Sequence, residues 1–184
     1  MAAQSTNPKV LAELSESEKQ FDERVVHVDR VARVVKGGRR FRFRALVVVG
    51  DHKNRVGVGS AKGADVTAAI TKAGEKAKKS MMTLSLYKGT LPHETTAKVG
   101  GSNILIMPAS AGTGLIAGGV VRTILEVAGV SNAVSKSLGS NNKTNTAYAT
   151  IKALEQVVPA NKWTTNRMSA KTADKPAGKK VTKK

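Results

Sequence analysis

Hydrophobic and polar residues alternate most regularly between residues 41 and 49, where every second residue from Phe41 to Val49 is apolar. Arg42 and Arg44 occupy two of the positions between them. Because successive side chains of a β-strand point to opposite faces, this pattern predicts a strand with an apolar face and a cationic face. Weaker alternation predicts a preceding strand over residues 24–35, and its drift after Val31 indicates a bulge or fraying.

The segment 36–40, Lys-Gly-Gly-Arg-Arg, separates these two strands. Its glycines permit positive backbone angles, so it predicts a tight or bulged hairpin turn. A second turn at 51–54 leads to a short third strand over 55–60. A helix to about Met82 follows, because apolar residues recur every three or four positions: Val66, Ala69, Ile70, Ala73, Ala77 and Met81. The first half is therefore predicted to be a three-stranded antiparallel sheet with one helix across it.

The second half alternates strand-like and helix-like segments, which predicts a compact α/β layer with a four-stranded sheet and two helices. Strands are expected at 94–99, 102–107 and 130–137, and helices at 120–128 and 146–158. Apolar residues expected to face inward from the last helix are Ala147, Ile151, Leu154 and Val158. The fold class is accordingly α+β.

Composition shifts divide the chain into four parts. Residues 1–23 are expected to be a flexible acidic extension with a possible helical turn at 9–20, and residues 162–184 a flexible basic tail. Between them we expect a basic first domain over 24–88 and a C-terminal α/β domain over 89–161. The boundary is placed in the connection 84–93, which contains Gly89 and Pro92.

The net charge of +18 changes this picture most, because such self-repulsion implies an anionic partner. Nucleic acid is the first candidate and an anionic membrane surface the second. Residues 24–62 contain eleven Lys or Arg against two acids, whereas residues 99–161 carry only +2. The interleaving of charge with strand-forming residues therefore favours a folded β surface that meets a polyanion.

Several function classes find no support in the sequence. The chain has no cysteine, three histidines in unrelated surroundings and no paired carboxylates or Ser/His/Asp arrangement. We therefore expect no enzyme activity, no metal and no cofactor. Since no signal peptide and no apolar run of about 18 residues appear, a cytoplasmic location and no membrane partner are expected.

Nucleic-acid contact is predicted for the hairpin and for the cations expected beside it. The predicted nucleic-acid-binding residues are Arg33, Lys36, Gly37, Gly38, Arg39, Arg40, Arg42, Arg44, Arg55, Lys62, Lys72, Lys76 and Lys79; the resemblance described below implies that the nucleic acid is RNA. The lysines of the helix form a stripe that is either a solvated face or a second phosphate-tracking edge. Phe41 and Phe43 lie opposite the arginines, so core packing is favoured over stacking on bases.

Two glycine-rich segments need separate interpretation. Residues 57–63, Gly-Val-Gly-Ser-Ala-Lys-Gly, match neither common nucleotide-binding motif. A turn glycine or a backbone contact with phosphate is expected there. In residues 110–119 packing and a protein interface are favoured over phosphate binding, although the segment precedes a helix. The predicted protein-interface residues are Gly112, Gly114, Gly118, Gly119 and Arg122.

Two long segments carry a specific resemblance: the first runs from VKGGRRFRFRALVVVG to KAGEKAK, and the second from PASAGTGLIAGG to SKSLGSNN. Over about residues 24–158 the chain resembles the bacterial-type family of the fifth protein of the small ribosomal subunit. The family usually has Ser-Lys where this chain has Ala32-Arg33, so the cation at 33 is kept. Where the family often has Tyr-Gly, this chain has Ser60-Ala61.

This resemblance implies a first domain similar to double-stranded-RNA-binding folds and a non-catalytic protein of the small ribosomal subunit. The implied partners are small-subunit ribosomal RNA and the fourth and eighth small-subunit proteins, with the messenger RNA path nearby. It also implies a role in decoding accuracy, through the region of Gly114 and Arg122. Two rivals are a kinase-like second half that binds ATP on its glycine-rich segment and a free-standing double-stranded-RNA chaperone.

Overall fold

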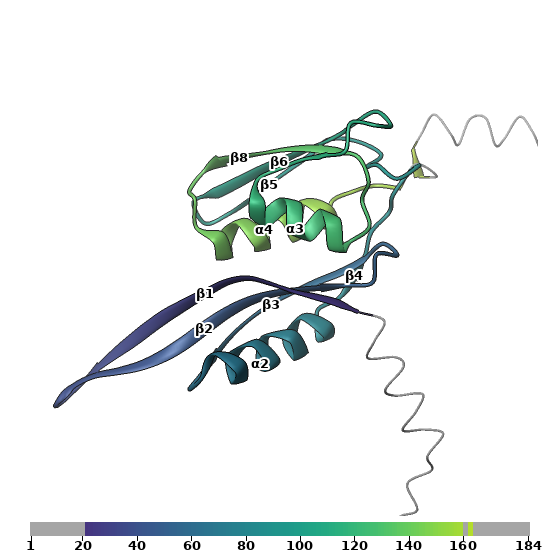
Figure 1. Cartoon of the computed structure of the whole chain (residues 1–184). Coiled ribbons are helices and arrows are strands. Elements are labelled where there is room, and N and C mark those ends of the chain that lie inside the picture. The colour runs from purple at the N-terminus through teal and green to yellow at the C-terminus, as the bar shows by residue number, and fades with distance from the viewer. Residues whose placement is uncertain (1–20, 160–161, 164–184) are drawn as a thin grey trace, which may run out of the picture.

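The computed structural model describes residues 21–159 and 162–163. The expected helical turn at 9–20 and nearly all of the expected basic tail lie outside the described residues. The described part is a stack of four layers (Figure 1). From the top of the view these are a sheet, a pair of helices, a second sheet and a single helix. The lower sheet and the single helix come from the first half of the chain, and the other two layers come from the second half.

The sheet of the first half has four antiparallel strands in the order β1-β2-β3-β4. They are β1 (Asp22–Val35), β2 (Gly38–Gly50), β3 (Arg55–Gly63) and β4 (Met82–Thr83). The sequence predicts only three of these four strands. The fourth, β4, escapes prediction because it contains only two residues. The β1–β2 register shifts between Val25 and His27, which is earlier than the apolar drift after Val31 indicates.

The apolar run of β2 is explained by the helices that cover both faces of its sheet. All residues from 45 to 50 are buried. Ala45, Val47 and Val49 pack in one cluster with α2 (Val66–Lys79). Leu46 and Val48 belong to a second cluster that contains residues of both helices from the second half of the chain. A strand buried on both faces needs an unbroken apolar sequence, and β2 has one over 45–49.

Helix α2 lies unusually close to β3, and glycines make this approach possible. A Cβ atom on Gly59 would lie 2.1 Å from the carbonyl oxygen of Ala73, and one on Gly57 would lie 2.2 Å from that of Ala77. The expectation of a turn glycine or a phosphate contact at 57–63 is therefore wrong, because these glycines are packing positions. Val66 was expected on the apolar face of the helix, but 37% of its surface is exposed.

The sheet of the second half has the strand order β5-β6-β8-β7, in which only the β7–β8 pair is parallel. Its strands are β5 (Thr95–Val99), β6 (Ser102–Pro108), β7 (Leu115–Ile116) and β8 (Ala133–Gly139). The fourth strand, β7, lies inside the glycine-rich segment where only a turn was expected. The expected strand at 130–137 begins three residues later, at Ala133.

Two helices of the second half lie between the sheets: α3 (Gly119–Val127) and α4 (Lys143–Glu155). Helix α4 begins three residues earlier than expected, because the Asn142 side chain accepts a hydrogen bond from the backbone N–H of Thr144 (3.1 Å). It also ends before Val158, which is exposed, and Val157 is the buried residue beyond its end. The expected inward position of Val158 is therefore wrong.

The two halves share one hydrophobic cluster. Val56 and Val58 of β3 pack in it together with Ile124 and Leu125 of α3 and Leu154 of α4. All of these side chains are buried. The upper face of the first sheet and the lower face of the α3–α4 layer therefore form one core.

Candidate nucleic-acid interface

The β1–β2 hairpin extends beyond the rest of the first sheet as an arm. We define the arm as residues 31–42, because the last β2–β3 pair is Phe43–Gly63 and no third strand accompanies the hairpin beyond it. All residues from 32 to 42 are exposed, and the arm projects past the helices (Figure 1). A projecting hairpin has no core to build, so its sequence is free to serve contact with a partner.

The tip of the arm is the tight turn that the sequence predicts. Strand β1 ends at Val35 and β2 begins at Gly38, which leaves only two residues in the loop. Gly37 and Gly38 have positive φ angles of 145° and 144°, a region that favours glycine. No heavy atom of the residues that the structure describes lies within 4 Å of a Cβ placed on either glycine, so backbone conformation and not space requires glycine here.

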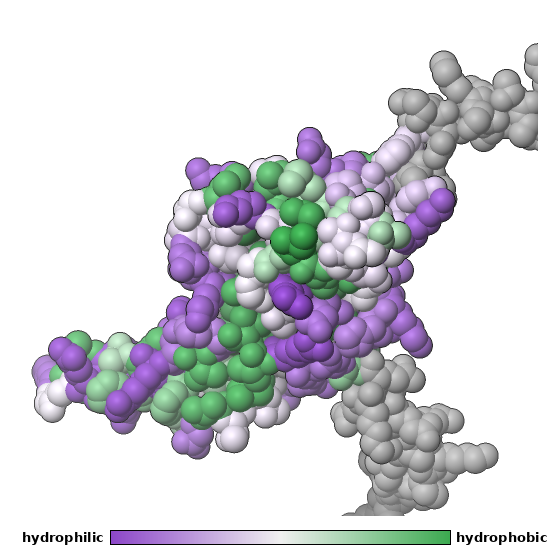
Figure 2. All heavy atoms as spheres, turned by 45° about the horizontal axis from the view of Figure 1, so that its top comes forward, coloured by the Kyte–Doolittle hydropathy of each residue, from purple (hydrophilic) through white to green (hydrophobic). Residues whose placement is uncertain are grey.

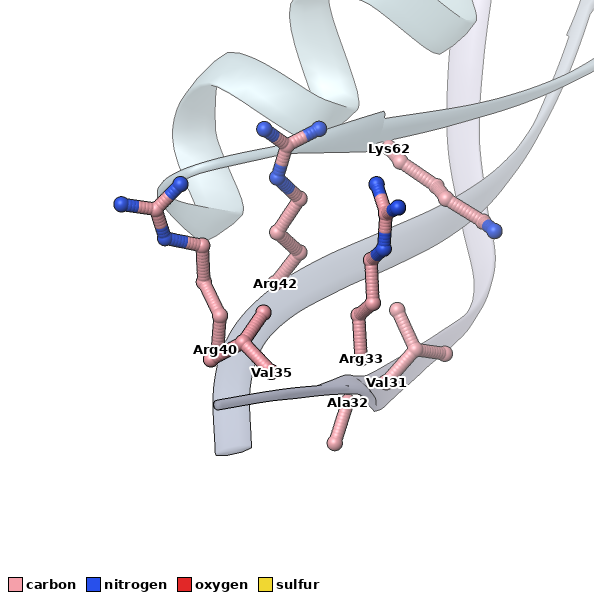
Figure 3. A pocket seen from close by; sticks show the side chains of 7 residues that line it. All are labelled: Val31, Ala32, Arg33, Val35, Arg40, Arg42 and Lys62. Carbon is pink, nitrogen blue, oxygen red and sulfur yellow. The ribbon is translucent and has the colours of Figure 1, made fainter. Parts of the chain in front are cut away.

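One side of the arm collects cations from both of its strands and from β3. In the antiparallel register Arg33 lies opposite Arg40, and Arg42 is two residues further along β2. Directly paired residues share a face of the sheet. Lys62 of β3, opposite Arg44, completes this side. Figure 3 shows the three guanidinium groups extending to the same side of the hairpin, with Lys62 reaching over from β3. We call Arg33, Arg40, Arg42 and Lys62 the cationic face.

The cationic face surrounds a pocket of about 320 Å³, which Val31, Ala32 and Val35 of β1 also line. Among the described residues, no carboxylate lies within ion-pair distance of its four cations. Four positive charges held together without an acid repel one another and favour a polyanion above them. Arginine forks suit phosphate oxygens geometrically.

The opposite side of the arm is less charged and more apolar. The guanidinium carbon of Arg30 lies 3.8 Å from the centre of the Phe41 ring, in a cation–π contact. Phe41 is nevertheless 46% exposed, whereas Phe43 packs against the α2 cluster. The expectation of core packing is thus correct for Phe43 and wrong for Phe41. Apolar and polar residues alternate visibly along the arm (Figure 2).

Arg44 differs from the cationic face because it has an acidic partner. Its Nη2 donates to Asp29 Oδ2 (2.7 Å), and its Nε donates to the same oxygen (3.1 Å). This hydrogen bonding with Arg44 is the main reason that the pKa of Asp29 lies below its usual range, and the hydrogen bond with His27 adds to it. The positive charge of Arg44 is therefore largely balanced within the protein.

The structure does not bring every predicted RNA-binding residue to the cationic face. Arg55 lies at the other end of β3 from Lys62, and its Nε donates to Asp51 Oδ2 (2.7 Å). The lysines of the helix stripe are exposed, but α2 covers the opposite face of the first sheet. That stripe consists of Lys72, Lys76 and Lys79. Arg39 also points to the opposite side of the arm, since it is opposite Val34 in the register.

The glycine-rich segment of the second half is held by one asparagine. Asn132 Oδ1 accepts hydrogen bonds from the backbone N–H groups of Gly112 (3.1 Å) and Gly114 (2.9 Å). These N–H groups are therefore already bonded within the chain, which argues against a nucleotide-phosphate loop. Gly118 and Gly119 face open space, and Arg122 is exposed one turn along α3. None of the described residues packs where their side chains would be, so the alternative of packing against the helices and sheets of this part of the chain is wrong.

Sequence reasoning missed one group of residues that lies beside the cationic face. His27, Asp29 and Arg44 from the first sheet meet residues 141–144 at the beginning of α4, around a second pocket of about 320 Å³. Lys143 Nζ donates to His27 Nδ1 (3.2 Å) across this pocket. The sequence marks residues 141–144 only as polar and suited to a helix cap, and their position beside the arm is a consequence of tertiary structure.

In the part of the chain that the structure describes, no group of three or more His, Asp or Glu side chains could hold a metal ion. None of the helices described is both long and apolar enough to cross a membrane.

Comparison with known proteins identifies both halves of the chain. Residues 21–85 match the family described as ribosomal protein S5, N-terminal domain, and residues 97–167 match its C-terminal domain. A protein of Treponema pallidum named small ribosomal subunit protein uS5 is 52% identical over 153 residues, which cover 83% of this chain and 89% of that protein. The proteins of the same name from Thermus thermophilus and Lawsonia intracellularis are each 50% identical, over 76% and 77% of this chain and 86% of their own lengths.

Proposed function

The chain belongs to the ribosomal protein S5 family, and we propose that it binds small-subunit ribosomal RNA through the cationic face of its arm. As a member of this family it is a structural protein of the small ribosomal subunit, in the cytoplasm, where it takes part in translation, and it is not an enzyme. One observation carries the RNA contact: three arginines on a projecting hairpin, with Lys62 of β3 beside them, have no carboxylate partner among the described residues.

The mechanism that these residues support is electrostatic. Each cation that neutralises a phosphate releases a counterion from the RNA, and this release drives binding at low salt. Arginine and lysine contacts with phosphates fix position and orientation without reading bases. Helical RNA is recognised mainly by its shape and backbone, which suits a surface of Arg, Lys and backbone glycine. The arm would therefore position the protein on an RNA helix and not select a sequence.

A second part of the proposal concerns neighbouring proteins. Gly118 and Gly119 leave the start of α3 open, and Arg122 is exposed beside them. An open helix start with a single exposed arginine suits close approach by another chain. We assign this region, with Gly112 and Gly114, to contacts with the fourth and eighth small-subunit proteins. Such contacts, near the messenger RNA path, would support decoding accuracy.

The proposal also divides the chain by role. Residues 24–88 would act as the RNA-binding domain and residues 89–161 as the domain that contacts proteins. The exposed stripe of Lys72, Lys76 and Lys79 would meet a different RNA segment from the arm, because it lies on the other side of the first sheet. Subunit assembly would then depend on both faces.

The sharpest test compares two neighbouring arginines. Arg40→Gln and Arg39→Gln remove the same charge from adjacent exposed positions, but only Arg40 belongs to the cationic face. Binding of each purified variant to transcribed small-subunit ribosomal RNA would be measured between about 50 and 200 mM salt, where phosphate contacts change affinity strongly. We expect Arg40→Gln to reduce the slope of log affinity against log salt by about one phosphate contact, and Arg39→Gln to change it much less.

The outcomes are distinct. If both variants reduce the salt slope equally, the arm binds RNA without a preferred face, and the assignment to the cationic face is wrong. If neither loses affinity, the arm is not an RNA contact. Sedimentation of a lysate that contains the tagged protein separates a ribosomal protein from a free RNA chaperone, because only a ribosomal protein travels stoichiometrically with small subunits.

A further inference from the structure

The pocket between the two halves of the chain adjoins the cationic face. Arg44, which lines this pocket, lies directly opposite Lys62 in the sheet and two residues from Arg42. Side chains two residues apart on one strand are spaced by about 6.6 Å and share a face. Arg40, Arg42 and Arg44 therefore form a row on one face of β2, and this row ends at the pocket beside the second half of the chain.

At that point a chain of polar contacts crosses from the first half to the second. Arg44 Nη2 donates to Asp29 Oδ2 (2.7 Å), and His27 Nε2 lies 2.8 Å from Asp29 Oδ1. His27 Nδ1 lies 3.2 Å from Lys143 Nζ. Because the lysine ammonium only donates, Nδ1 must accept, and the ring proton must then sit on Nε2, where it is donated to Asp29.

This arrangement leaves one positive charge uncompensated in the pocket. The charge of Arg44 is balanced by Asp29, and a histidine that accepts at Nδ1 is neutral. The ammonium of Lys143 is therefore held in place without a carboxylate partner among the described residues. Lys143 is exposed, as are the neighbouring amides of Asn141 and Asn142. The amide side chains offer N–H donors of the kind that bind phosphate and sugar oxygens.

We infer that Lys143 is a further RNA-backbone contact and that one RNA helix lies across both halves of the protein, from the arm to the start of α4. The cationic face holds the first phosphates, and Lys143, with Asn141, holds phosphates further along the same backbone. His27 is a positioning residue, since its ring fixes the lysine above the pocket. This inference rests on the proposed RNA binding and adds to it a contact from the second half, which the sequence assigns to proteins alone.

The experiment uses the full chain and transcribed small-subunit ribosomal RNA as the probe. Lys143→Gln is compared with Lys152→Gln, a matched charge removal on the same helix at an exposed position away from the pocket. Salt dependence of binding is measured for both, together with Arg40→Gln. We expect Lys143→Gln to reduce the salt slope by about one contact and Lys152→Gln to leave it unchanged. Lys143→Arg keeps the charge and is expected to retain the slope.

A double-mutant cycle tests the role of His27. His27→Ala is expected to weaken RNA binding in the wild-type background and to have little further effect when Lys143 is already glutamine. Equal effects of His27→Ala in both backgrounds would show that the histidine does not act through the lysine. Thermal unfolding of each variant checks that the fold is kept, which is expected because Lys143 is exposed.

The failure of this inference differs from that of the proposed function. If Arg40→Gln reduces the salt slope while Lys143→Gln and Lys152→Gln behave alike, the arm binds RNA and the second half does not, so the inference is overturned. If Arg40→Gln itself has no effect, the RNA binding of the arm is wrong, and the inference fails with it.

Discussion

The backbone N–H of His52, in the turn between β2 and β3, donates a hydrogen bond to the carbonyl oxygen of Val127 at the end of α3 (3.1 Å). Asn54 makes the equivalent bond with Ala128 (3.1 Å). The turn of the first sheet thus closes the last turn of a helix from the second half. These bonds satisfy carbonyl groups that a helix end would otherwise leave unpaired.

Gly129 controls this junction. Its φ angle is +85°, and a Cβ atom there would lie 2.3 Å from the carbonyl oxygen of His52. We expect Gly129→Ala to destabilise the protein by at least about 2 kcal/mol, since it combines a left-handed backbone with a collision against backbone. Urea unfolding measures this. Gly119→Ala, where the new methyl group meets no described residue within 4 Å, is the control and should be neutral or slightly stabilising.

The contact between α2 and β3 gives a second prediction. Gly59→Ala would place a methyl group 2.1 Å from the carbonyl oxygen of Ala73 and push the helix away from the sheet. We expect a loss of about 3 kcal/mol. Gly74→Ala, in the same helix, would meet only the Glu23 carboxylate at 3.1 Å and should gain up to about 1 kcal/mol from helix propensity. Equal stabilities of the two variants in urea would contradict the close packing.

Asp51 organises the turn between β2 and β3. Its buried carboxylate accepts hydrogen bonds from the backbone N–H groups of Lys53 (2.8 Å) and Arg55 (3.1 Å) and from the Arg55 side chain. We expect Asp51→Ala to cost about 1–3 kcal/mol, because three donors lose their acceptor. Thermal unfolding would show this as a lower Tm. Asp65→Ala is the comparison, since Asp65 precedes α2 without a side-chain capping bond. If it lowers the Tm as much as Asp51→Ala does, the three hydrogen bonds of Asp51 are not the cause of the loss.

The pKa of Asp29 predicts a specific dependence on acid. Hydrogen bonding with Arg44 lowers this pKa in the folded protein below its ordinary value near 3.8. The carboxylate therefore stabilises the fold fully above that ordinary value, and the contribution is lost as pH falls through the lower, folded pKa. Between pH 5 and 2, the free energy of unfolding should fall less steeply in Asp29→Asn than in the wild type. If the free energies of unfolding of the two proteins fall in parallel with pH, Asp29 contributes nothing to the acid dependence of stability.

Local pattern was enough to predict the longer elements, because strand alternation and helical spacing are local properties. The alternation from Phe41 to Val49 correctly predicts β2 and its arginine side. The positions of Lys36 and Gly37 correctly predict the turn. Strand β4 was not predictable, because two residues carry no period. Nor was the bulge near Val26, since it depends on the partner strand.

The site was predictable only in part, because pattern gives a residue's face but not its neighbours. Alternation places Arg40 and Arg42 together, yet nothing local distinguishes Arg44, whose partner Asp29 lies on another strand. Phe41 has the period of a core residue and lies past the end of the helix that would cover it. Lys143 is more than 100 residues from His27 in sequence, so only the fold brings them together. Long-range packing decides these cases.

The core shared by the two halves has a consequence for synthesis. Leu46, Val48 and Val56 are covered by α3 and α4, and these helices begin only at Gly119 and Lys143. During translation the first three strands, which end at Gly63, therefore leave the ribosome with an apolar face uncovered until roughly 60 to 90 further residues have been added, which takes about 3–20 s at roughly 5–20 residues per second. A newly made chain in that interval is exposed to aggregation and is a natural client for chaperones.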